Sequence, residues 1–378
     1  MLSLGALVLA LAGTAVAQGQ PAPQPAREAS AQEKPTRPAS APIHIAWVGD
    51  IVLEVPWRPS AVSPRALFDG VRERLLSSDL VIGNLESPLT DWTEQTPYKN
   101  KADVEAGRDV IFRVASPEAA RALFDGGIRV VSLANNHTAD YAEPGLLDTI
   151  QRLRNAGVLY AGAGENLAAA EAPRVAEIKG WRIGIICFSD VVPKYSWAEV
   201  NRPGIATAKE SERLVQAVAR ARPTVDLLIV VLHWGVQFDR TPSPRQEFLA
   251  QGAQRAGADL VLGAHPHVLQ GVGCLGRVPI VYSAGNFVFP TMSLPTRRTA
   301  IFEFEFSGKG KLAVRVVPVI IDDRGAPQLA DDEPRNEILT EMGQLSLPLG
   351  LQLEGDSGSC GEAPGSAPVS SGGNLELH

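Results

Sequence analysis

The sequence predicts an α/β protein in which mostly parallel strands alternate with helices. Short runs of β-branched and aliphatic residues are separated by segments of about ten to fifteen residues with helical spacing, which is the pattern of βαβ units. Five apolar runs end in a short block of polar residues. Because ligands bind at the carboxyl ends of parallel strands, we expect these blocks to converge on one site.

The first half of the body is expected to contain three strands and three helices. The strands span 43–48, 79–82 and 128–133. Ser63 and Ser116 are N-cap candidates, each followed by Pro at the first helical position, and Gly126 and Gly157 are helix-ending glycines. The helices they delimit span 64–76, 117–124 and 144–155.

The second half continues the pattern and then departs from it. Strands are expected over 225–232, 259–262 and 278–283, and a helix over 244–256. Two further pairs of segments indicate antiparallel strands, and we expect them to form a second sheet packed on the first. The pairs are 174–178 with 181–188, and 299–306 with 312–319.

The N-terminus predicts an exported protein. Residues 2–16 are apolar and small, and Ala15-Val16-Ala17 fits an A-x-A cleavage site, although no Lys or Arg precedes the apolar run. We therefore expect a secreted or periplasmic protein, with tethering to the membrane by an uncleaved N-terminal segment as the alternative. The expected organisation is a signal peptide over 1–17, a Pro/Ala-rich linker over 18–42, a domain over 43–345 and a low-complexity, disordered tail over 346–378.

Composition excludes some classes of function. The chain has 378 residues, 45% hydrophobic and 20% charged, which is ordinary for a globular protein with a sizeable core. Its net charge of −7 argues against binding nucleic acid or an anionic membrane surface. The three cysteines are too few for a disulfide scaffold. Cys187 is expected to be an inert core thiol, and Cys274 and Cys360 are expected to be unpaired, with a disulfide as the alternative in an oxidising compartment.

The polar blocks contain four of the six histidines, the others being His44 and His378. Asp, Glu, Asn and His at successive strand ends are the donors that an open-sided divalent metal site needs. The blocks are Gly49-Asp50, Gly83-Asn84-Leu85-Glu86, Asn135-Asn136-His137, His233-Trp234-Gly235 and Gly263-Ala264-His265-Pro266-His267.

His265 and His267 give the sharpest signal. In extended backbone, residues i and i+2 face the same side about 6.5 Å apart, so both imidazoles can reach one metal. Pro266 restricts the backbone between them. Asn84 and Glu86 have the same spacing and offer an amide oxygen and a carboxylate.

The other blocks leave alternatives open. Asp50 fits a metal ligand, a turn residue or an N-cap, and His233 fits a ligand or a hydrogen-bonded core histidine. The imidazole of His137 could act as a general acid rather than as a metal ligand. Asp140 is close enough in sequence to orient His137, or it caps the helix near Pro144.

The ordered series of blocks resembles the poly-gamma-glutamate capsule synthesis (CapA-type) family, a branch of the calcineurin-like metallophosphoesterase superfamily. The resemblance covers about residues 43–290. The matching segments are Val48-Gly49-Asp50-Ile51, Gly83-Asn84-Leu85-Glu86-Ser87-Pro88, Leu133-Ala134-Asn135-Asn136-His137 with Asp140-Tyr141, His233-Trp234-Gly235, Gly257-Ala258-Asp259, His265-Pro266-His267 and Tyr282-Ser283-Ala284-Gly285-Asn286-Phe287.

This resemblance implies a four-layer α-β-β-α sandwich with one or two divalent ions (Mn, Fe or Zn) at the strand carboxyl ends. It implies His137 as the acid that protonates the leaving oxygen, with Asp140 beside it. Val52 stands where the superfamily usually has a ligand histidine, which favours one tightly held ion or one tight and one loose. The implied ligands are Asp50, Glu86, Asn136, His233, His265 and His267, and further pocket residues are Asn84, Asn135, Trp234 and Asn286.

The resemblance also implies a function in capsule or poly-gamma-glutamate synthesis. We expect metal-dependent hydrolysis of a phosphoester or of a surface-polymer bond. The alternative is a non-catalytic capsule assembly or export component that binds an anionic polymer through metal and a basic rim of Lys99, Lys101 and Arg113. Expected partners are a phosphoester substrate or anionic polymer and membrane-bound capsule synthase components. A third interpretation, in which the polar blocks only satisfy strand ends, leaves the four ordered histidines unexplained.

Overall fold

The computed structural model describes residues 41–55, 62–107, 109–291, 293–307 and 312–361. The predicted signal peptide, nearly all of the predicted linker and residues 362–378 lie outside this range. Within it, no helix combines the length and the apolar character needed to cross a membrane.

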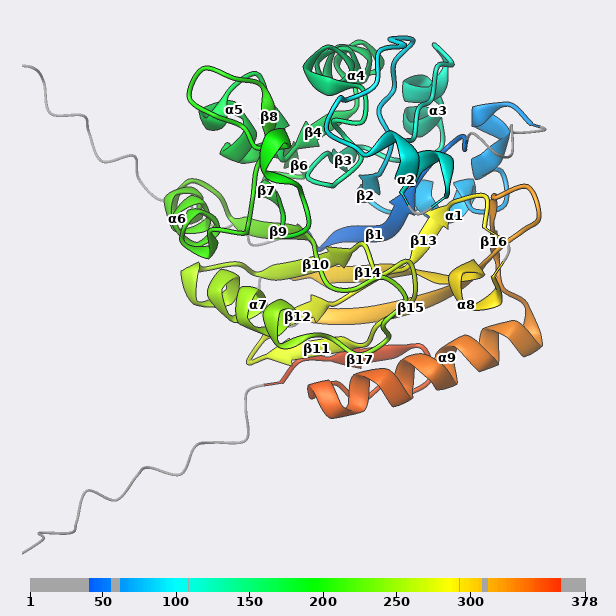
Figure 1. The fold of residues 1–378 in the computed structure, drawn as a ribbon. Coiled ribbons are helices and arrows are strands. Elements are labelled where there is room, and N and C mark those ends of the chain that lie inside the picture. Colours follow the sequence, from blue (N-terminus) through cyan, green and yellow to red (C-terminus); the bar gives the residue numbers. More distant parts are fainter. Residues whose placement is uncertain (1–40, 56–61, 108, 292, 308–311, 362–378) are drawn as a thin grey trace, which may run out of the picture. The chain divides into compact units, whose positions relative to one another are not determined.

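The first of two large sheets contains the N-terminal parallel strands (Figure 1). Its nine described strands follow the order β16-β15-β14-β1-β2-β3-β4, with β13 paired to β1 and β17 paired to β15. Strands β1, β2, β3 and β4 are parallel to one another, and β14 joins β1 antiparallel. The strands are β1 (Ile43–Ile51), β2 (Leu80–Leu85), β3 (Val130–Ser132), β4 (Leu159–Ala161), β13 (Asn286–Val288), β14 (Arg298–Phe306), β15 (Leu312–Ile321), β16 (Pro327–Leu329) and β17 (Ser357–Ser359).

The second sheet has six described strands in the order β11-β12-β10-β9-β7-β6. Its central strands β7, β9, β10 and β12 are parallel. The strands are β6 (Arg174–Ile178), β7 (Trp181–Ser189), β9 (Leu227–His233), β10 (Leu260–Ala264), β11 (Val272–Leu275) and β12 (Val278–Val281). A separate short pair joins β5 (Ala163–Gly164) to β8 (Gly204–Ile205).

Helices cover the outer faces of both sheets, so the layers run helix, sheet, sheet, helix, as expected (Figure 1). Helices α6 (Ser211–Ala221) and α7 (Pro244–Ala256) lie on the six-stranded sheet, and α3 (Ala119–Asp125) and α4 (Ala142–Ala156) lie on the other. Helix α9 (Asp332–Ser346) contacts β15 of one sheet and β11 of the other. The remaining short helices are α1 (Arg72–Leu76), α2 (Lys101–Glu105), α5 (Leu167–Glu171) and α8 (Leu294–Arg297), with 3-10 turns η1 (Pro64–Phe68), η2 (Lys194–Ser196), η3 (Arg222–Thr224) and η4 (Leu347–Leu349).

Strand β9 shows why its sequence is an uninterrupted apolar run. Ile229 and Val231 belong to the core shared by the two sheets. Leu228 and Val230 belong to the core between the sheet and helices α6 and α7. A strand buried on both faces has no polar face to show, which is usual for parallel sheets covered by helices.

Three predicted elements differ from the structure. Both antiparallel pairs form, but β6–β7 extends the six-stranded sheet and β14–β15 belongs to the nine-stranded one, so the second sheet is not made of these pairs. The predicted helix over 64–76 is split into η1 and α1. The break lies near Gly70, where a Cβ would come within 2.7 Å of the backbone carbonyl oxygen of Pro327, a close approach that glycine allows.

The C-terminal region is more ordered than expected. Strand β17 pairs antiparallel with β15, and Cys360 forms a disulfide with Cys274. The domain therefore continues past the predicted boundary at residue 345 at least as far as Cys360, because strand pairing and a covalent bond hold a segment whose composition alone suggested disorder. Cys187 is free and buried, and burial raises the pKa of its thiol to about 12, as suits an inert core residue.

Candidate metal centre

The five polar blocks meet at the carboxyl ends of parallel strands from both sheets. Asp50 in β1 lies opposite Asn84 in β2, and Asn84 lies opposite Ser132 at the end of β3. In the other sheet, His233 ends β9 opposite Ala264, which ends β10. The loops after β3 and β10 therefore start beside the ends of β2 and β9, and blocks far apart in the sequence become neighbours.

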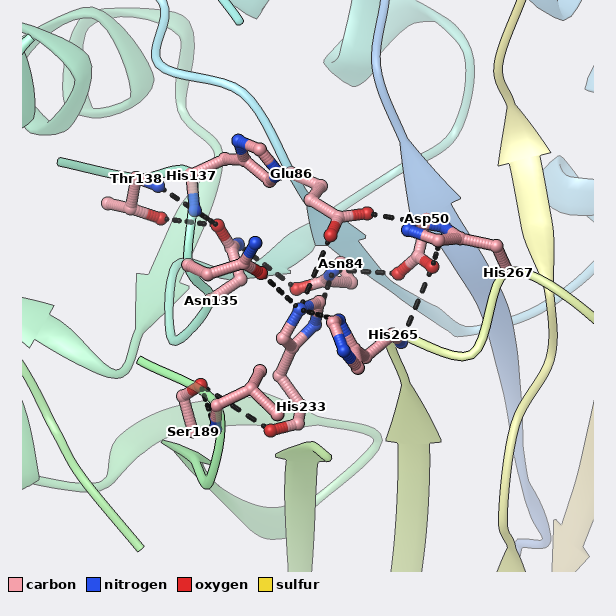
Figure 2. Close-up of polar contacts among 12 residues, drawn as sticks. Asp50, Asn84, Glu86, Asn135, His137, Thr138, Ser189, His233, His265 and His267 are labelled. Carbon is pink, nitrogen blue, oxygen red and sulfur yellow. Dashed lines mark hydrogen bonds and ion pairs between the residues drawn. The ribbon is translucent and has the colours of Figure 1, made fainter. Parts of the chain in front are cut away.

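Glu86 lies at the centre of the site (Figure 2). Two groups of side chains in the described residues place one ligand atom each within 4.8 Å of one another, close enough to hold a metal ion. One group is Glu86, His233 and His265, and the other is Asp50, Glu86 and His267. Both groups are buried and share the Glu86 carboxylate.

His265 and His267 do not adopt the expected extended backbone. Their φ angles are 100° and 59°, in the left-handed region that non-glycine residues rarely occupy. The two imidazoles consequently enter different groups instead of sharing one ion. Backbone strain of this kind persists only where the surroundings fix it, and it concentrates at functional sites.

The buried carboxylate of Glu86 fits a cation. The residue is fully buried, and neither of its oxygens has a hydrogen-bond partner in the described part of the chain. Nε2 of His233 lies 3.3 Å from Oε1, and Nδ1 of His267 lies 3.8 Å from Oε2. Leaving a buried charge without hydrogen bonds is costly unless a metal ion or counter-charge compensates it. Imidazole nitrogens with carboxylate oxygens are donors that suit Zn, Fe or Mn.

The pKa values reflect this crowding of charge. Burial and the charge of Glu86 raise the pKa of Asp50. Burial opposes the charged form of His267, but Glu86 and Asp50 outweigh it and raise its pKa to about 9. For Glu86, burial is outweighed by the charges of His267 and His233, which lower its pKa. Burial and the nearby His233 hold the pKa of His265 well below its usual value, so its imidazole is neutral, the form that binds metal.

Asn84 and Asn136 lie beside these groups. Nδ2 of Asn84 donates to Oδ1 of Asp50 at 2.8 Å and lies 3.2 Å from Nδ1 of His233. The other ring nitrogen of His233, Nε2, is 2.8 Å from Oδ1 of Asn136 and 3.1 Å from Nδ1 of His265. Asn84 thus orients the His233 ring, and the amide oxygen of Asn136 joins the ring nitrogens at the first group.

Asn135 and Asn286 support the site without entering either group. Oδ1 of Asn135 accepts from the backbone N–H groups of His137 and Thr138, at 3.1 and 3.0 Å, and so shapes the loop after β3. Oδ1 of Asn286 lies 2.9 Å from Nδ1 of His267, and its Nδ2 donates to the carbonyl of Thr296. Both are positioning residues.

Trp234 does not line the site. Its indole N–H donates to the carbonyl of Tyr282 at 2.8 Å, and the two rings are stacked. The side chain is fully buried in the core beneath helices α6 and α7. Residues 233 and 234 face opposite ways, as neighbours along extended backbone do, so only His233 reaches the site.

His137 stands beside the two groups but belongs to neither. Its Nδ1 lies 2.8 Å from Oδ2 of Asp140, and its ring packs against Phe112 with centroids 4.4 Å apart. Asp140 does not cap α4, whose N-cap is Tyr141. An imidazole whose Nδ1 is held by a carboxylate has Nε2 left for proton transfer.

Lys99 was expected on a basic rim, but its side chain is only 7% exposed. Nζ lies 2.7 Å from Oδ1 of Asp140 and 3.3 Å from Nδ1 of His137. Lys99 lies in an irregular segment between β2 and α2, so no periodicity in the sequence could reveal its burial. Of the expected rim, Lys101 is exposed and Arg113 is partly exposed.

Val52 stands in the first block, at the position where the resemblance implied a histidine. It is fully buried and packs with Val55 and Phe112 in a small apolar cluster that Val110 and Phe289 border. Phe289 also contacts His267, with ring centroids 5.5 Å apart. Apolar packing therefore borders the Asp50–Glu86–His267 group on the side of position 52.

Comparison with known proteins gives a family match. The model of the family "Bacterial capsule synthesis protein PGA_cap" matches residues 44–291. The chain is 34% identical to "Capsule biosynthesis protein CapA" of Bacillus anthracis, over 73% of this chain and 66% of that protein. It is 32% identical to "PGA biosynthesis protein CapA" of Bacillus subtilis (strain 168), over 73% of this chain and 71% of that protein. The chain thus spans about two thirds of the length of these relatives.

Solved structures with a similar arrangement are more distant in sequence. A putative 5'-nucleotidase from Staphylococcus aureus is 15% identical with a TM-score of 0.47, over 80% of this chain and 58% of that one. The NAD nucleotidase of Haemophilus influenzae is 15% identical with a TM-score of 0.40, over 80% of this chain and 63% of that one.

Proposed function

The chain belongs to the bacterial capsule synthesis protein PGA_cap family, and we propose that it is a secreted or periplasmic metal-dependent hydrolase. Its substrate is proposed to be a phosphoester or another bond of an anionic surface polymer. The observation that supports this most is the Glu86 carboxylate, which is buried without hydrogen bonds and shared by two groups of potential ligands.

The proposed ligands divide between two ions. Asp50, Glu86 and His267 would hold one, and Glu86, His233 and His265, with the Asn136 amide oxygen beside them, would hold the other. A divalent ion bound there supplies positive charge that stabilises negative charge on a phosphoryl oxygen. Asn84 and Asn286 contact Asp50, His233 and His267 and would hold these ligands in place for the ions.

His137 is the proposed general acid. Asp140 fixes its Nδ1, so Nε2 can give a proton to the leaving-group oxygen. As the bond from phosphorus to that oxygen breaks, the oxygen of an attacking water bonds to phosphorus, and the proton that the water loses passes to solvent. Phe112 packs against the ring and limits its rotation. The charge on the leaving oxygen is thereby neutralised by a residue outside both ion groups.

The context of the relatives supports a polymer as substrate or partner. The proteins from B. anthracis and B. subtilis are described as capsule and PGA biosynthesis proteins. We propose that this chain meets an anionic polymer of the same chemical kind, together with membrane-bound synthase components. Lys101 and Arg113 are the members of the predicted basic rim that remain accessible to it.

The test compares the wild-type protein with His137→Ala, both loaded with manganese, iron or zinc. A panel of phosphomonoesters, phosphodiesters and poly-gamma-glutamate is assayed for cleavage and for binding. Cleavage by the wild type alone supports the proposal. Polymer binding by both proteins, with no cleavage of any member of the panel, would instead favour a non-catalytic assembly or export component.

A further inference from the structure

We infer that Lys99 is a positioning residue for His137 and acts through Asp140. The inference rests on the proposed function, because it concerns the proton that His137 gives to the leaving group. It starts from a buried cation that neither metal group uses: the Lys99 side chain is 7% exposed and the Asp140 side chain 1%. A buried lysine is stable only when paired.

The ammonium group of Lys99 is held on several sides. Nζ donates to the carbonyl of Val110 at 2.6 Å, and it lies 2.7 Å from Oδ1 of Asp140, 3.3 Å from Nδ1 of His137 and 3.6 Å from Oδ1 of Asp109. An Nδ1 that donates its N–H to Asp140 cannot also accept from Nζ, so the ammonium acts on His137 through Asp140. These contacts fix the charge beside Asp140 rather than leaving it to move in solvent. The amine is therefore in a defined place next to the proposed acid.

The two oxygens of Asp140 have separate partners. Oδ1 meets Lys99, and it has no hydrogen bond to another residue in the described part of the chain. Oδ2 accepts from the backbone N–H of Phe112 at 2.8 Å and pairs with Nδ1 of His137 at 2.8 Å. With both oxygens held, the plane of the carboxylate is fixed, and with it the direction in which Nδ1 of His137 is bound.

One segment supplies most of this support. Lys99 and Phe112 both belong to the stretch between β2 and α3, and the backbone N–H of Thr96 in the same stretch donates to the carbonyl of Asp140 at 2.9 Å. Without the Lys99 charge, Asp140 would be a buried carboxylate with one oxygen unpaired, free to turn away from His137. Nε2 of His137 would then no longer point reliably at the leaving oxygen.

The test uses substrates that differ in their need for a proton. An alkyl phosphate needs its leaving oxygen protonated, whereas p-nitrophenolate leaves without help. For Lys99→Met we expect kcat/KM on the alkyl ester to fall by about 10- to 100-fold, part of what a general acid provides, and to fall by less than about threefold on the nitrophenyl ester. Lys209→Met, which removes an exposed lysine charge in the segment between β8 and α6, is the control and should change neither.

Equal losses on both esters, or no loss on either, would overturn the inference, because a merely structural role does not depend on the leaving group. The double variant Lys99→Met, Asp140→Asn should have nearly the same kcat/KM on the alkyl ester as Asp140→Asn alone, because Lys99 acts through Asp140. A loss in the double variant equal to the two single losses combined would contradict this. Should Lys99→Met not fold, Lys99→Arg, which displaces the buried charge, takes its place with the same two outcomes.

Failure of the proposed function is recognised separately. If the metal-loaded wild type cleaves neither ester, the hydrolase proposal fails and Lys99 is tested by ¹⁵N NMR of the His137 ring, assigned with His137→Gln. A single tautomer protonated at Nδ1 in the wild type, and a mixture in Lys99→Met, supports the positioning role. Identical spectra would refute it.

Discussion

Glu86 and His233 meet across the two sheets, with Oε1 of Glu86 3.3 Å from Nε2 of His233. Glu86 directly follows β2 of the nine-stranded sheet, and His233 is the last residue of β9 in the six-stranded sheet. Each potential metal group contains residues from both sheets, because His265 and His267 also follow the six-stranded sheet's β10. Neither sheet alone can form the site, so it exists only when the sheets are packed together.

Replacing His137 by alanine should abolish turnover while leaving metal bound. The imidazole lies outside both metal groups, so its loss removes the proton donor and not a ligand. We expect kcat on an alkyl phosphate to fall by about 10²- to 10⁴-fold, with metal content per chain unchanged by elemental analysis. Unchanged turnover would rule out His137 as the acid.

Gly49→Ala should destabilise the protein and weaken the metal site. A Cβ at this position would come within 1.8 Å of the Gly285 carbonyl oxygen, which accepts the N–H of the neighbouring Asp50 at 3.0 Å. Overpacking of this kind costs about 1–3 kcal/mol of unfolding free energy. Denaturant unfolding measures the loss.

Gly343→Ala is the matched control for that substitution. Gly343 lies within α9, and a Cβ there would meet no atom within 4 Å. We expect this variant to be more stable than the wild type by about 0.5–1 kcal/mol, because alanine favours the helix. If the two alanine variants lost stability equally, close packing at Gly49 would not be the cause.

Removing the Cys274–Cys360 disulfide should lower the free energy of unfolding. The bond joins residues separated by 86 positions, and loop entropy for such a closure gives an upper value of about 4–5 kcal/mol. The double variant Cys274→Ser, Cys360→Ser should unfold at lower denaturant and no longer respond to reductant. Reductant that leaves the wild type's midpoint unchanged would show that the bond contributes little.

Asp79 should make the free energy of unfolding depend on pH in the acid range. Burial raises the pKa of this carboxyl, but hydrogen bonds from Lys179 and from the backbone N–H of His44 outweigh burial and lower it. A group whose pKa is lower in the folded state stabilises the fold above its unfolded pKa of about 3.9, and this contribution is lost as pH falls through the folded value. Asp79→Asn should therefore cost about 1 kcal/mol at pH 7.

The difference between wild type and Asp79→Asn should shrink as the pH falls below about 4 and vanish at lower pH. Unfolding midpoints measured for both proteins across this range check it. A difference that stays constant with pH would mean that the charge of Asp79 is not what stabilises the fold.

Strands and helices with strong local signals could be predicted from the sequence. The helix over 244–256 matches α7, because Ser243 with Gln246 forms a capping box at its start and Gly257 ends it in the left-handed conformation. The strand before His233 is unmistakable because it is buried on both faces. Helix α9 was missed, since only Ile338, Met342 and Ser346 of its residues are buried and its apolar stripe is short.

The residues of the site could be predicted from the sequence, but their division into two potential metal groups could not. Histidines and carboxylates after apolar runs indicated the ligands, whereas the separate placement of His265 and His267 depends on φ angles that local sequence does not set. Trp234 and Lys99 are two further residues whose placement could not be predicted from local sequence. Which way Trp234 faces, and whether Lys99 is buried, are decided by tertiary packing against Tyr282 and Asp140.

The most direct test of the account is metal content per chain, measured by elemental analysis after loading with manganese, iron or zinc. Wild type and the exposed-histidine control His44→Ala should hold about two equivalents, one for each group. His265→Ala should lose about one, and Glu86→Ala, which removes the shared carboxylate, should lose both. Wild-type protein without metal after loading, or Glu86→Ala that still holds two equivalents, would contradict a metal centre built around Glu86.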